Sequence, residues 1–353
     1  MNFLFLVVLF GGVCYASSDV SIEPLVDHVV VLKVPHRGRT EEEVPLVCGR
    51  DNLTQDVFWK KDGMELNPPL KGNRITVLVE EMEGGNYSCH LSPGGQYLNH
   101  TIIFIQLDSE ERVILKEKSP EEGRFRETEC VMCVCVFESC GGSKRSSVPP
   151  GHIHCSAPNY TGPFRCSWTR ADSRSNAAVL LLQATRNGQQ IPCELDAGGS
   201  GVLCQDNSCS YKEEQHHILF TIHVHSYSRL ETYTKAFYLK DIVRPGALSN
   251  LQMDNAKVFS WSYPDSWEKP CSFYGLNFQY RVVRHNHPCD SNTAILVNTT
   301  DDTKFEVNVK AKKYVFCVRA QDKYTQGPFG PWSSCVVTKE EAGCQPLSPG
   351  QRK

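Results

Sequence analysis

Short runs of alternating apolar and polar residues recur along the whole chain. The clearest run is residues 314–319, in which Tyr314, Phe316 and Val318 share one face and Arg319 lies on the other. A period of two is typical of β-strands, and comparable runs end in residues that favour turns. Long helical patterns rich in Leu, Ala, Glu and Lys are absent from the sequence. For 353 residues, the pattern therefore predicts an all-β protein of three modules of about one hundred residues each.

The N-terminus predicts export from the cell. Residues 1–16 hold an apolar core from Phe3 to Phe10 and small residues before a cleavage point after Ala16, as a secretory signal peptide does. No later stretch of the sequence reaches the about 18 apolar residues that a membrane helix needs. The chain has 17 cysteines, which favours disulfides formed in an oxidising compartment. We therefore expect a secreted, extracellular protein without a membrane anchor.

The net charge bears on the class of partner, and the glycosylation sequons bear on the chemistry of the surface. A net charge of -3 at pH 7, with mixed signs, gives no basic surface of the kind that binds nucleic acid. Asn-X-Ser/Thr sequons in a secreted chain predict glycans on at least some of these asparagines: Asn52, Asn86, Asn99, Asn159 and Asn298.

Residues 17–107 predict an immunoglobulin-like sandwich. Cys48, Trp59 and Cys89 follow one another in the order expected for that fold, and Tyr87 precedes the second cysteine by two positions. These residues match the inter-sheet disulfide, the core tryptophan and the tyrosine corner. A Cys48–Cys89 disulfide closes a loop of about forty residues, which the chain-entropy model values at roughly 3–4 kcal/mol.

Two clusters contain residue types that bind zinc. Residues 108–150 form a charged linker whose cysteines suit either zinc or local disulfides, and a secreted chain favours disulfides in any of three connectivities. His223 and His225 project from one face of a predicted strand, but no third ligand has clear spacing, so we expect solvated histidines. We predict no metal and no cofactor. The cysteines of the linker are Cys130, Cys133, Cys135 and Cys140.

Residues 151–243 predict the second module. Two cysteine pairs are expected in it: Cys155 with Cys166, followed by Trp168, and Cys193 with Cys204, which bracket a glycine-rich turn. The first spacing suits a hairpin stapled across its strands. Cys209 then has no obvious partner in a polar loop, which predicts an intermolecular disulfide or, alternatively, a free or cysteinylated thiol.

Residues 244–340 predict the third module, and residues 341–353, with Cys344, a disordered tail. The chain enters this module through Pro245, whose fixed φ makes a stiff elbow. Its cysteines suggest two disulfides: Cys317 with Cys335, which fall on neighbouring predicted strands, and Cys271 with Cys289.

A receptor-like motif lies near the end of the third module. Val318-Arg319-Ala320 is followed, after a turn, by Phe329 and Trp332 on the next predicted strand. An arginine beside an aromatic ring forms a cation–π pair worth ~0.5–2 kcal/mol. These residues resemble the class I cytokine-receptor homology family, whose last fibronectin type III domain carries V-R-A and W-S-x-W-S. Phe329 stands where that family has the first tryptophan, so the resemblance implies a shortened aromatic ladder.

The resemblance extends to the order of the modules. One immunoglobulin-like domain followed by two fibronectin type III modules is similar to the receptor-like beta subunits of heterodimeric cytokines of the interleukin-12/23 type. In that family the elbow between the last two modules grips a four-helix-bundle alpha subunit, and an arginine of the bundle enters an acidic pocket ringed by tyrosines. The resemblance implies that Cys209 is the interchain cysteine and that the pocket consists of Tyr160, Phe273, Asp322 and Tyr324.

The sequence allows two roles for Asp322: binding an arginine of the alpha subunit, or stabilising its own turn. A carboxylate beside aromatic rings meets a guanidinium through paired hydrogen bonds and stacking, a contact worth ~2 kcal/mol or more. Alternatively, Asp322 only accepts hydrogen bonds from the amides of its own turn.

We therefore expect a secreted, glycosylated beta subunit, disulfide-linked through Cys209 to a four-helix-bundle alpha subunit, that engages cell-surface cytokine receptors in immune signalling. The sequence leaves homodimers open. The alternative is a soluble decoy or carrier receptor that binds its cytokine reversibly. A matrix or adhesion protein would need tandem repeats or long stalks, and an enzyme would need a motif such as G-x-S-x-G or H-E-x-x-H; the sequence has none of these.

Overall fold

The computed structural model describes residues 20–35, 41–49, 56–67, 69–80, 83–108, 112–118, 151–207, 214–254, 257–267, 269, 271–272, 274–338 and 345–346. Its regular structure consists of strands β1 to β24, a 3-10 turn η1 (Asp172–Arg174) and one short helix α1 (Leu239–Ile242) within those ranges. The prediction of an all-β protein is confirmed. Several sequence predictions lie outside the described residues: the signal peptide 1–16, the cysteine cluster 130–140, Asn52, Cys209, Phe273 and Cys344.

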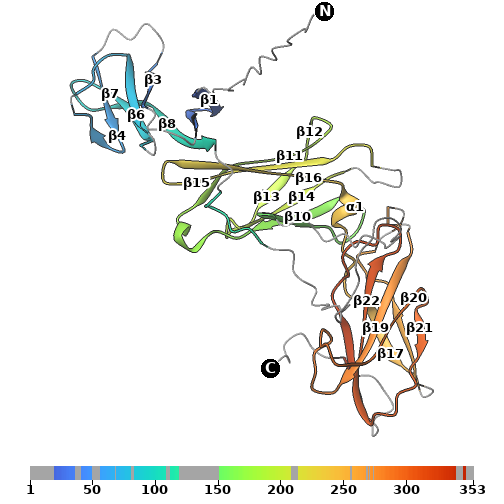
Figure 1. Cartoon of the computed structure of the whole chain (residues 1–353). Coiled ribbons are helices and arrows are strands. Elements are labelled where there is room, and N and C mark those ends of the chain that lie inside the picture. Colours follow the sequence, from blue (N-terminus) through green and yellow to red (C-terminus); the bar gives the residue numbers. More distant parts are fainter. Residues whose placement is uncertain are drawn as a thin grey trace, which may run out of the picture. The chain divides into compact units, whose positions relative to one another are not determined.

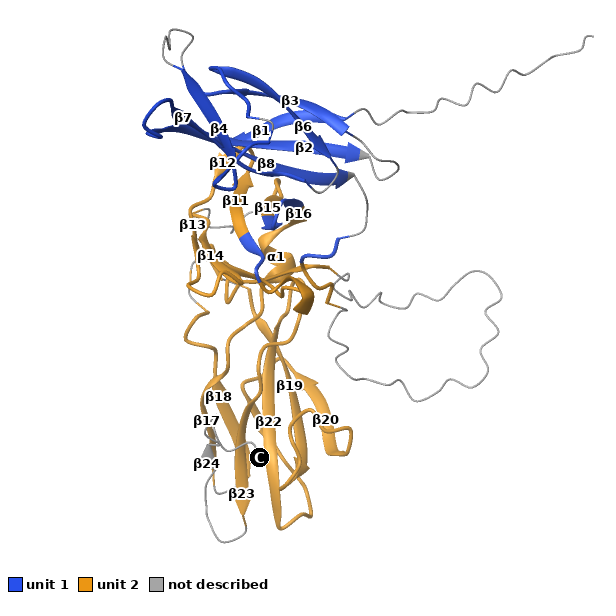
Figure 2. Ribbon diagram, turned by 90° about the vertical axis from the view of Figure 1, so that its left-hand side faces the viewer, with its two compact units in different colours: residues 1–114, 176–178, 224–231 blue, residues 115–175, 179–223, 232–353 orange. Residues whose placement is uncertain are grey.

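The chain divides into two compact units, coloured in Figure 2. The first unit holds the residues up to Ile114 together with 176–178 and 224–231, and the second unit holds the remainder. The division does not follow the predicted module boundaries, which stay predictions. Within the described part of the chain, no helix is long and apolar enough to cross a membrane.

The first unit is built from two sheets (Figure 1). One sheet places β8 between β2, its parallel neighbour, and β7, its antiparallel neighbour, and the other sheet pairs β3 with β6. The strands are β1 (Ser21–Val26), β2 (Val29–Pro35), β3 (Glu41–Val47), β4 (Val57–Lys61), β5 (Met64–Glu65), β6 (Arg74–Glu80), β7 (Gly85–Leu91) and β8 (Tyr97–Asp108).

Alternation of apolar residues forms the core of this unit. On β6, Ile75, Val77 and Val79 are buried while the residues between them are exposed, because successive side chains of a strand point to opposite faces. The expected Cys48–Cys89 disulfide is present, and buried Trp59 lies in the same core cluster. This core is the one that the Cys-Trp-Cys order predicts.

In the second unit, two disulfides staple a four-stranded sheet. Its order is β13-β14-β10-β9, so β9 and β13 are edge strands. Each edge strand is bonded to its neighbour between residues directly opposite in register: Cys155 to Cys166, and Cys193 to Cys204. Both expected pairs are therefore present. The strands are β9 (Ile153–Ser156), β10 (Pro163–Trp168), β13 (Cys193–Leu195) and β14 (Gly201–Gln205).

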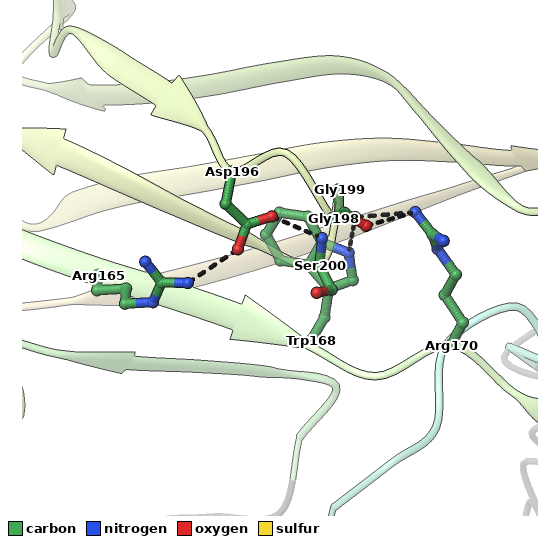
Figure 3. Close-up of polar contacts among 7 residues, drawn as sticks. All are labelled: Arg165, Trp168, Arg170, Asp196, Gly198, Gly199 and Ser200. Carbon is green, nitrogen blue, oxygen red and sulfur yellow. Dashed lines mark hydrogen bonds and ion pairs between the residues drawn. The ribbon is translucent and has the colours of Figure 1, made fainter.

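The glycine-rich turn between β13 and β14 is held by side chains from the segment that carries the Cys-Ser-Trp motif (Figure 3). Trp168 Nε1 and Arg170 Nη2 both donate to the carbonyl of Gly199, which has a φ of 60°. Asp196 accepts the amide of Ser200 and pairs with Arg165 at 2.8 Å. The motif tryptophan thus fixes the turn beside the second disulfide.

The strand order β12-β11-β15-β16 is part of the ten-stranded sheet that also holds β8 and β7. The tip of the β15–β16 hairpin belongs to the first unit, where Arg229 lies opposite Ile105 of β8. In the second unit, Phe164 of β10 meets Phe237 of β16 edge to face at 5.6 Å. The strands are β11 (Ala178–Arg186), β12 (Gln189–Gln190), β15 (Ile218–Ser226) and β16 (Arg229–Phe237).

The last part of the second unit is a sandwich of a three-stranded and a five-stranded sheet, ordered β17-β18-β21 and β20-β19-β22-β23-β24. Phe259 of β18 stacks on Phe316 of β22 with ring centroids 3.9 Å apart, which joins the sheets. The strands are β17 (Ser249–Met253), β18 (Val258–Ser262), β19 (Leu276–Arg284), β20 (Ala294–Thr300), β21 (Lys304–Glu306), β22 (Lys313–Asp322), β23 (Ser333–Thr338) and β24 (Gln345–Pro346).

The prediction that Cys317 bonds to Cys335 was wrong, as was the Cys271–Cys289 pair. Cys317 bonds to Cys289, and Cys271 and Cys335 each belong to other disulfides. β22 and β23 are neighbours as expected, but Cys317 lies opposite Ser334 and Cys335 lies opposite Phe316. Residues one register position apart point to opposite faces of a sheet, so these two thiols cannot meet.

The receptor-like motif forms a stack on the β19–β22–β23 sheet. The guanidinium of Arg319 lies 4.3 Å from the ring centroid of Phe329 and 4.2 Å from that of Trp332. Arg319 also donates from Nε and Nη2 to Gln279 Oε1, and Arg281 lies 5.9 Å from the Trp332 ring. Burial lowers the pKa of Arg319 to about 10, so the group stays charged at neutral pH. Phe329 thus takes part in the stack in place of a tryptophan.

We expect Arg319→Met to lower the free energy of unfolding by about 2 kcal/mol, because the variant loses two cation–π contacts and two hydrogen bonds. Thermal unfolding of the purified protein measures the change. Arg284→Met, at the exposed end of β19, is the matched control and should leave the midpoint nearly unchanged. Equal midpoints for the two variants would show that the stack contributes nothing.

Candidate functional site

The candidate site is centred on Asp322, the last residue of β22, which is 1% exposed. Its Oδ1 accepts the amides of Tyr324 and Thr325 at 2.7 and 2.8 Å, because the chain turns directly after the strand and aspartate side chains bind the amides of such turns. Its Oδ2 accepts the hydroxyl of Tyr160 at 3.0 Å. Asp322 therefore satisfies its turn, as the plainer interpretation expects, and in addition binds a residue 162 positions away.

Tyr160 reaches Asp322 from the loop between β9 and β10 and is 2% exposed. Its amide donates to the hydroxyl of buried Ser272. Gly162, with φ of 113°, allows this loop to lie against Asp206, since a β-carbon at Gly162 would collide with the Asp206 carbonyl. Burial and the charge of Asp322 raise the pKa of the Tyr160 hydroxyl, so it remains a hydrogen-bond donor.

Aromatic rings surround this pair. Tyr160 meets Trp267 and Tyr274 edge to face, each at 5.9 Å, and Tyr274 stacks on Tyr324 at 4.6 Å. Tyr324 is 55% exposed, which makes it the open side of the cluster. We call Tyr160, Trp267, Tyr274, Asp322 and Tyr324 the elbow site.

The structure assigns to Tyr274 a place that the sequence analysis gave to Phe273. Phe273 lies outside the described residues, whereas the ring of Tyr274 contacts both Tyr160 and Tyr324. The sequence signal was available, because Tyr274 is the second of two consecutive aromatic residues that precede β19.

Main-chain hydrogen bonds hold the elbow near the site. Ala157 donates to the Ile242 carbonyl at 2.9 Å and accepts from the Arg244 amide at 2.7 Å. Arg244 Nε donates to the Phe329 carbonyl at 2.8 Å. The chain entering the third predicted module is therefore bound to the β9–β10 loop on one side and to the arginine stack on the other.

The charge of Asp322 has no cationic partner within the described part of the chain. The nearest basic residue in sequence, Lys323, pairs instead with Asp301 at 2.6 Å. Buried carboxylates are usually matched by a cation, because burial removes the solvation of the charge. Asp322 is thus a buried carboxylate without a cationic partner among the described residues.

A second feature lies at the base of the segment that carries Cys209. Arg186 Nη2 pairs with Asp206 at 2.7 Å and with Glu214 at 3.1 Å. The side chain of Glu214 is 3% exposed and accepts the first amides of α1, those of Leu239 and Lys240. One guanidinium therefore holds residues on both sides of Cys209, which itself lies outside the described residues.

Comparison with known proteins supports the receptor-like interpretation. Residues 150–226 match the family described as "Cytokine interleukin-12p40 C-terminus". Three proteins named interleukin-12 subunit beta align over 90% to 92% of this chain and 94% to 96% of their own length: those of Marmota monax (25% identical), Homo sapiens (26%) and Lama glama (27%). The chain resembles the interleukin-12 beta subunits. These proteins are cytokine subunits, which are not a class of enzymes.

The likeness to interleukin-12 beta subunits extends over 90% to 92% of the chain. The family match itself includes Tyr160, Arg186 and Glu214 but ends before Asp322. The role of each site residue in binding a partner therefore remains a proposal.

The sequons differ sharply in exposure. Asn86 and Asn298 are exposed on β7 and β20, and Asn99 on β8 is partly exposed. Asn159 is 4% exposed, and its Nδ2 donates to the carbonyl of Ser266. The Asn159 side chain is buried in this structure, and a glycan there stays a prediction.

The histidines weighed as metal ligands have other contacts. His223 Nδ1 lies 2.9 Å from Thr232 Oγ1. His225 packs against Phe104 at 4.8 Å. Across the described ranges, no group of three or more His, Cys, Asp or Glu residues is placed to hold a metal ion.

We expect Tyr160→Phe to destabilise the protein by about 1–2 kcal/mol, because Asp322 Oδ2 loses its donor while staying buried. Denaturant unfolding measures the change. Tyr227→Phe removes a hydroxyl from an exposed tyrosine and is the control. If both variants unfold at the same denaturant concentration, the Tyr160–Asp322 hydrogen bond does not stabilise the elbow.

Proposed function

We propose that the chain is the receptor-like beta subunit of a secreted heterodimeric cytokine of the interleukin-12/23 type. Its elbow site receives an arginine of a four-helix-bundle alpha subunit, Cys209 forms the interchain disulfide, and the heterodimer engages cell-surface cytokine receptors. The observation that carries the proposal is the buried carboxylate of Asp322, which is surrounded by tyrosines and has no cationic partner among the described residues.

A guanidinium suits this site in charge and in shape. After the bonds from two amides and Tyr160, Oδ2 of Asp322 keeps a free lone pair, since each carboxylate oxygen accepts about two hydrogen bonds. A guanidinium is planar and stacks on aromatic rings as it donates to a carboxylate. The tyrosines of the elbow site provide such rings beside Asp322.

The partner arginine must move a ring to enter, because Asp322 is almost fully covered. Tyr324 is the exposed member of the site, and its ring stacks on Tyr274 rather than inserting into the core. Displacing this pair costs one stacking contact of about 1 kcal/mol, less than a desolvated arginine–carboxylate contact contributes. The closed state therefore protects the carboxylate from water until the partner binds.

The Arg186 ion pairs support the covalent part of the proposal. They fix Asp206 and Glu214, the described residues nearest to Cys209 on each side apart from Asn207. A thiol carried between two fixed points searches a smaller volume, and this restriction favours disulfide formation with a docked partner.

We expect a disulfide-linked heterodimer when the chain is secreted together with a suitable four-helix-bundle alpha subunit. Non-reducing electrophoresis should show a band of the combined mass that is lost on reduction and absent for Cys209→Ser. Reversible capture without any covalent band would favour a decoy or carrier receptor. Absence of both kinds of complex with every alpha subunit tried would refute the proposal.

We expect Arg186→Met to reduce the covalent fraction several-fold although Cys209 is retained, because Asp206 and Glu214 are no longer tied to one group. Non-reducing electrophoresis of co-secreted chains measures this fraction. Arg165→Met, which breaks the more exposed pair with Asp196, is the matched control. Arg186→Lys keeps the charge and tests folding. Recovery of secretion without recovery of the covalent fraction assigns the effect to the position of Nη2, which pairs with both carboxylates, and an unchanged covalent fraction in Arg186→Met contradicts it.

A further inference from the structure

We propose that Asn159 is a modification site that controls the elbow site. Without a sugar, Asn159 holds the β9–β10 loop against the segment after β18, so that Tyr160 binds Asp322; we call this the closed elbow. An N-linked glycan on Asn159 prevents this contact and keeps the elbow open. The consequence for partner binding rests on the proposed function above. The effect on the elbow itself does not, and it is tested without a partner.

The carboxamide of Asn159 is fully used in the closed structure. Its Nδ2 donates to the Ser266 carbonyl, and its Oδ1 accepts the amide and the hydroxyl of Thr161 at 2.8 and 2.7 Å. Thr161 is the hydroxyl residue of the same sequon. The residues that define the glycosylation site therefore also join the β9–β10 loop to the segment after β18.

Glycan transfer is chemically incompatible with this arrangement. Transfer forms a bond between Asn159 Nδ2 and C1 of the sugar; the amide loses one proton, and the pyrophosphate of a lipid-linked oligosaccharide donor leaves. At 4% exposure there is no space beside Nδ2 for a sugar ring. Modified and closed chains are thus two separate populations.

The order of synthesis decides which population forms. Ser266 lies 107 positions after Asn159, so the sequon is complete long before its buried partner is made. Glycan transfer acts on accessible sequons of a chain that has entered the secretory compartment. Asn159 is accessible in that interval and becomes protected only when the elbow closes.

The next residue couples this site to Asp322. Tyr160 donates its amide to Ser272 and its hydroxyl to Asp322. Both bonds require the β9–β10 loop to lie where the Asn159–Ser266 hydrogen bond holds it. A glycan at Asn159 would hold the loop away and leave Asp322 without its Tyr160 partner. Asn298, an exposed sequon on β20 whose Oδ1 accepts the amide of Thr299, serves as a control.

The test compares amide hydrogen exchange in the full secreted chain. The amides of Tyr324 and Thr325, which bond to Asp322, report closure of the elbow, and those of β19, the neighbour of β22, report folding of the sandwich that carries Asp322. Thr161→Val removes the sequon but keeps Asn159, and Asn159→Lys places a long charged side chain where the sugar would be. Asn298→Gln removes an exposed sequon.

We expect slow exchange at Tyr324 and Thr325 in Thr161→Val and Asn298→Gln, and about tenfold faster exchange in Asn159→Lys with β19 unchanged. Peptide mass spectrometry after enzymatic deglycosylation, which converts each sugar-bearing asparagine to aspartate, should find Asn159 sugar-free in the slowly exchanging population. Slow exchange in Asn159→Lys, or a sugar on Asn159 in molecules with a protected elbow, would overturn the proposal. Because neither readout uses an alpha subunit, these outcomes are independent of heterodimer formation.

Discussion

The buried carboxylate of Asp322 is the constraint on which the rest of the elbow depends. One oxygen closes the turn after β22 and the other binds Tyr160, so a single side chain fixes both its own loop and the loop between β9 and β10. A buried charge costs free energy, and within the described residues three hydrogen bonds rather than an ion pair offset this cost for Asp322. The same strand carries Arg319 three residues earlier, whose stack on Phe329 and Trp332 stiffens the sheet from which Asp322 projects.

The two proposed attachment points belong to one region of the second unit. The amide of Asp206 bonds to the Gly162 carbonyl at 3.1 Å, and Gly162 lies two residues after Tyr160. Glu214 is near enough for its charge to contribute to the raised pKa of the Tyr160 hydroxyl. The Arg186 ion pairs, which hold residues on both sides of Cys209, are thus adjacent to the elbow site. This proximity gives the proposed non-covalent and covalent contacts a common base, so that docking at one would raise the effective concentration at the other.

The sequence predicted the core of the first unit and the disulfides within hairpins correctly, but it did not predict which residues of neighbouring strands face each other. The Cys-Trp-Cys order located the core of the first unit, and the spacings of Cys155–Cys166 and Cys193–Cys204 located their disulfides, because each depends on residues close in sequence or on a common fold. Cys317 and Cys335 failed because neighbouring strands alone do not fix which residues face each other. Tyr274 was missed for a similar reason, since the direction of a loop side chain is set by contacts far away in sequence. The sequon at Asn159 looked like its exposed counterparts because nothing near it reveals Ser266 as its partner.

The affinity of the Cys209→Ser protein for its alpha subunit, measured with and without Asp322→Asn, tests the central claim most directly. The asparagine keeps the size of the side chain and its carbonyl acceptor for the turn but removes the negative charge, and Cys209→Ser removes the covalent contribution. If Asp322 receives an arginine of the partner, the dissociation constant should rise by about thirtyfold or more, as expected for a loss of ~2 kcal/mol or more at a desolvated charge pair. An unchanged dissociation constant, with the elbow still protected from hydrogen exchange, would show that Asp322 only holds the fold and that the partner binds elsewhere.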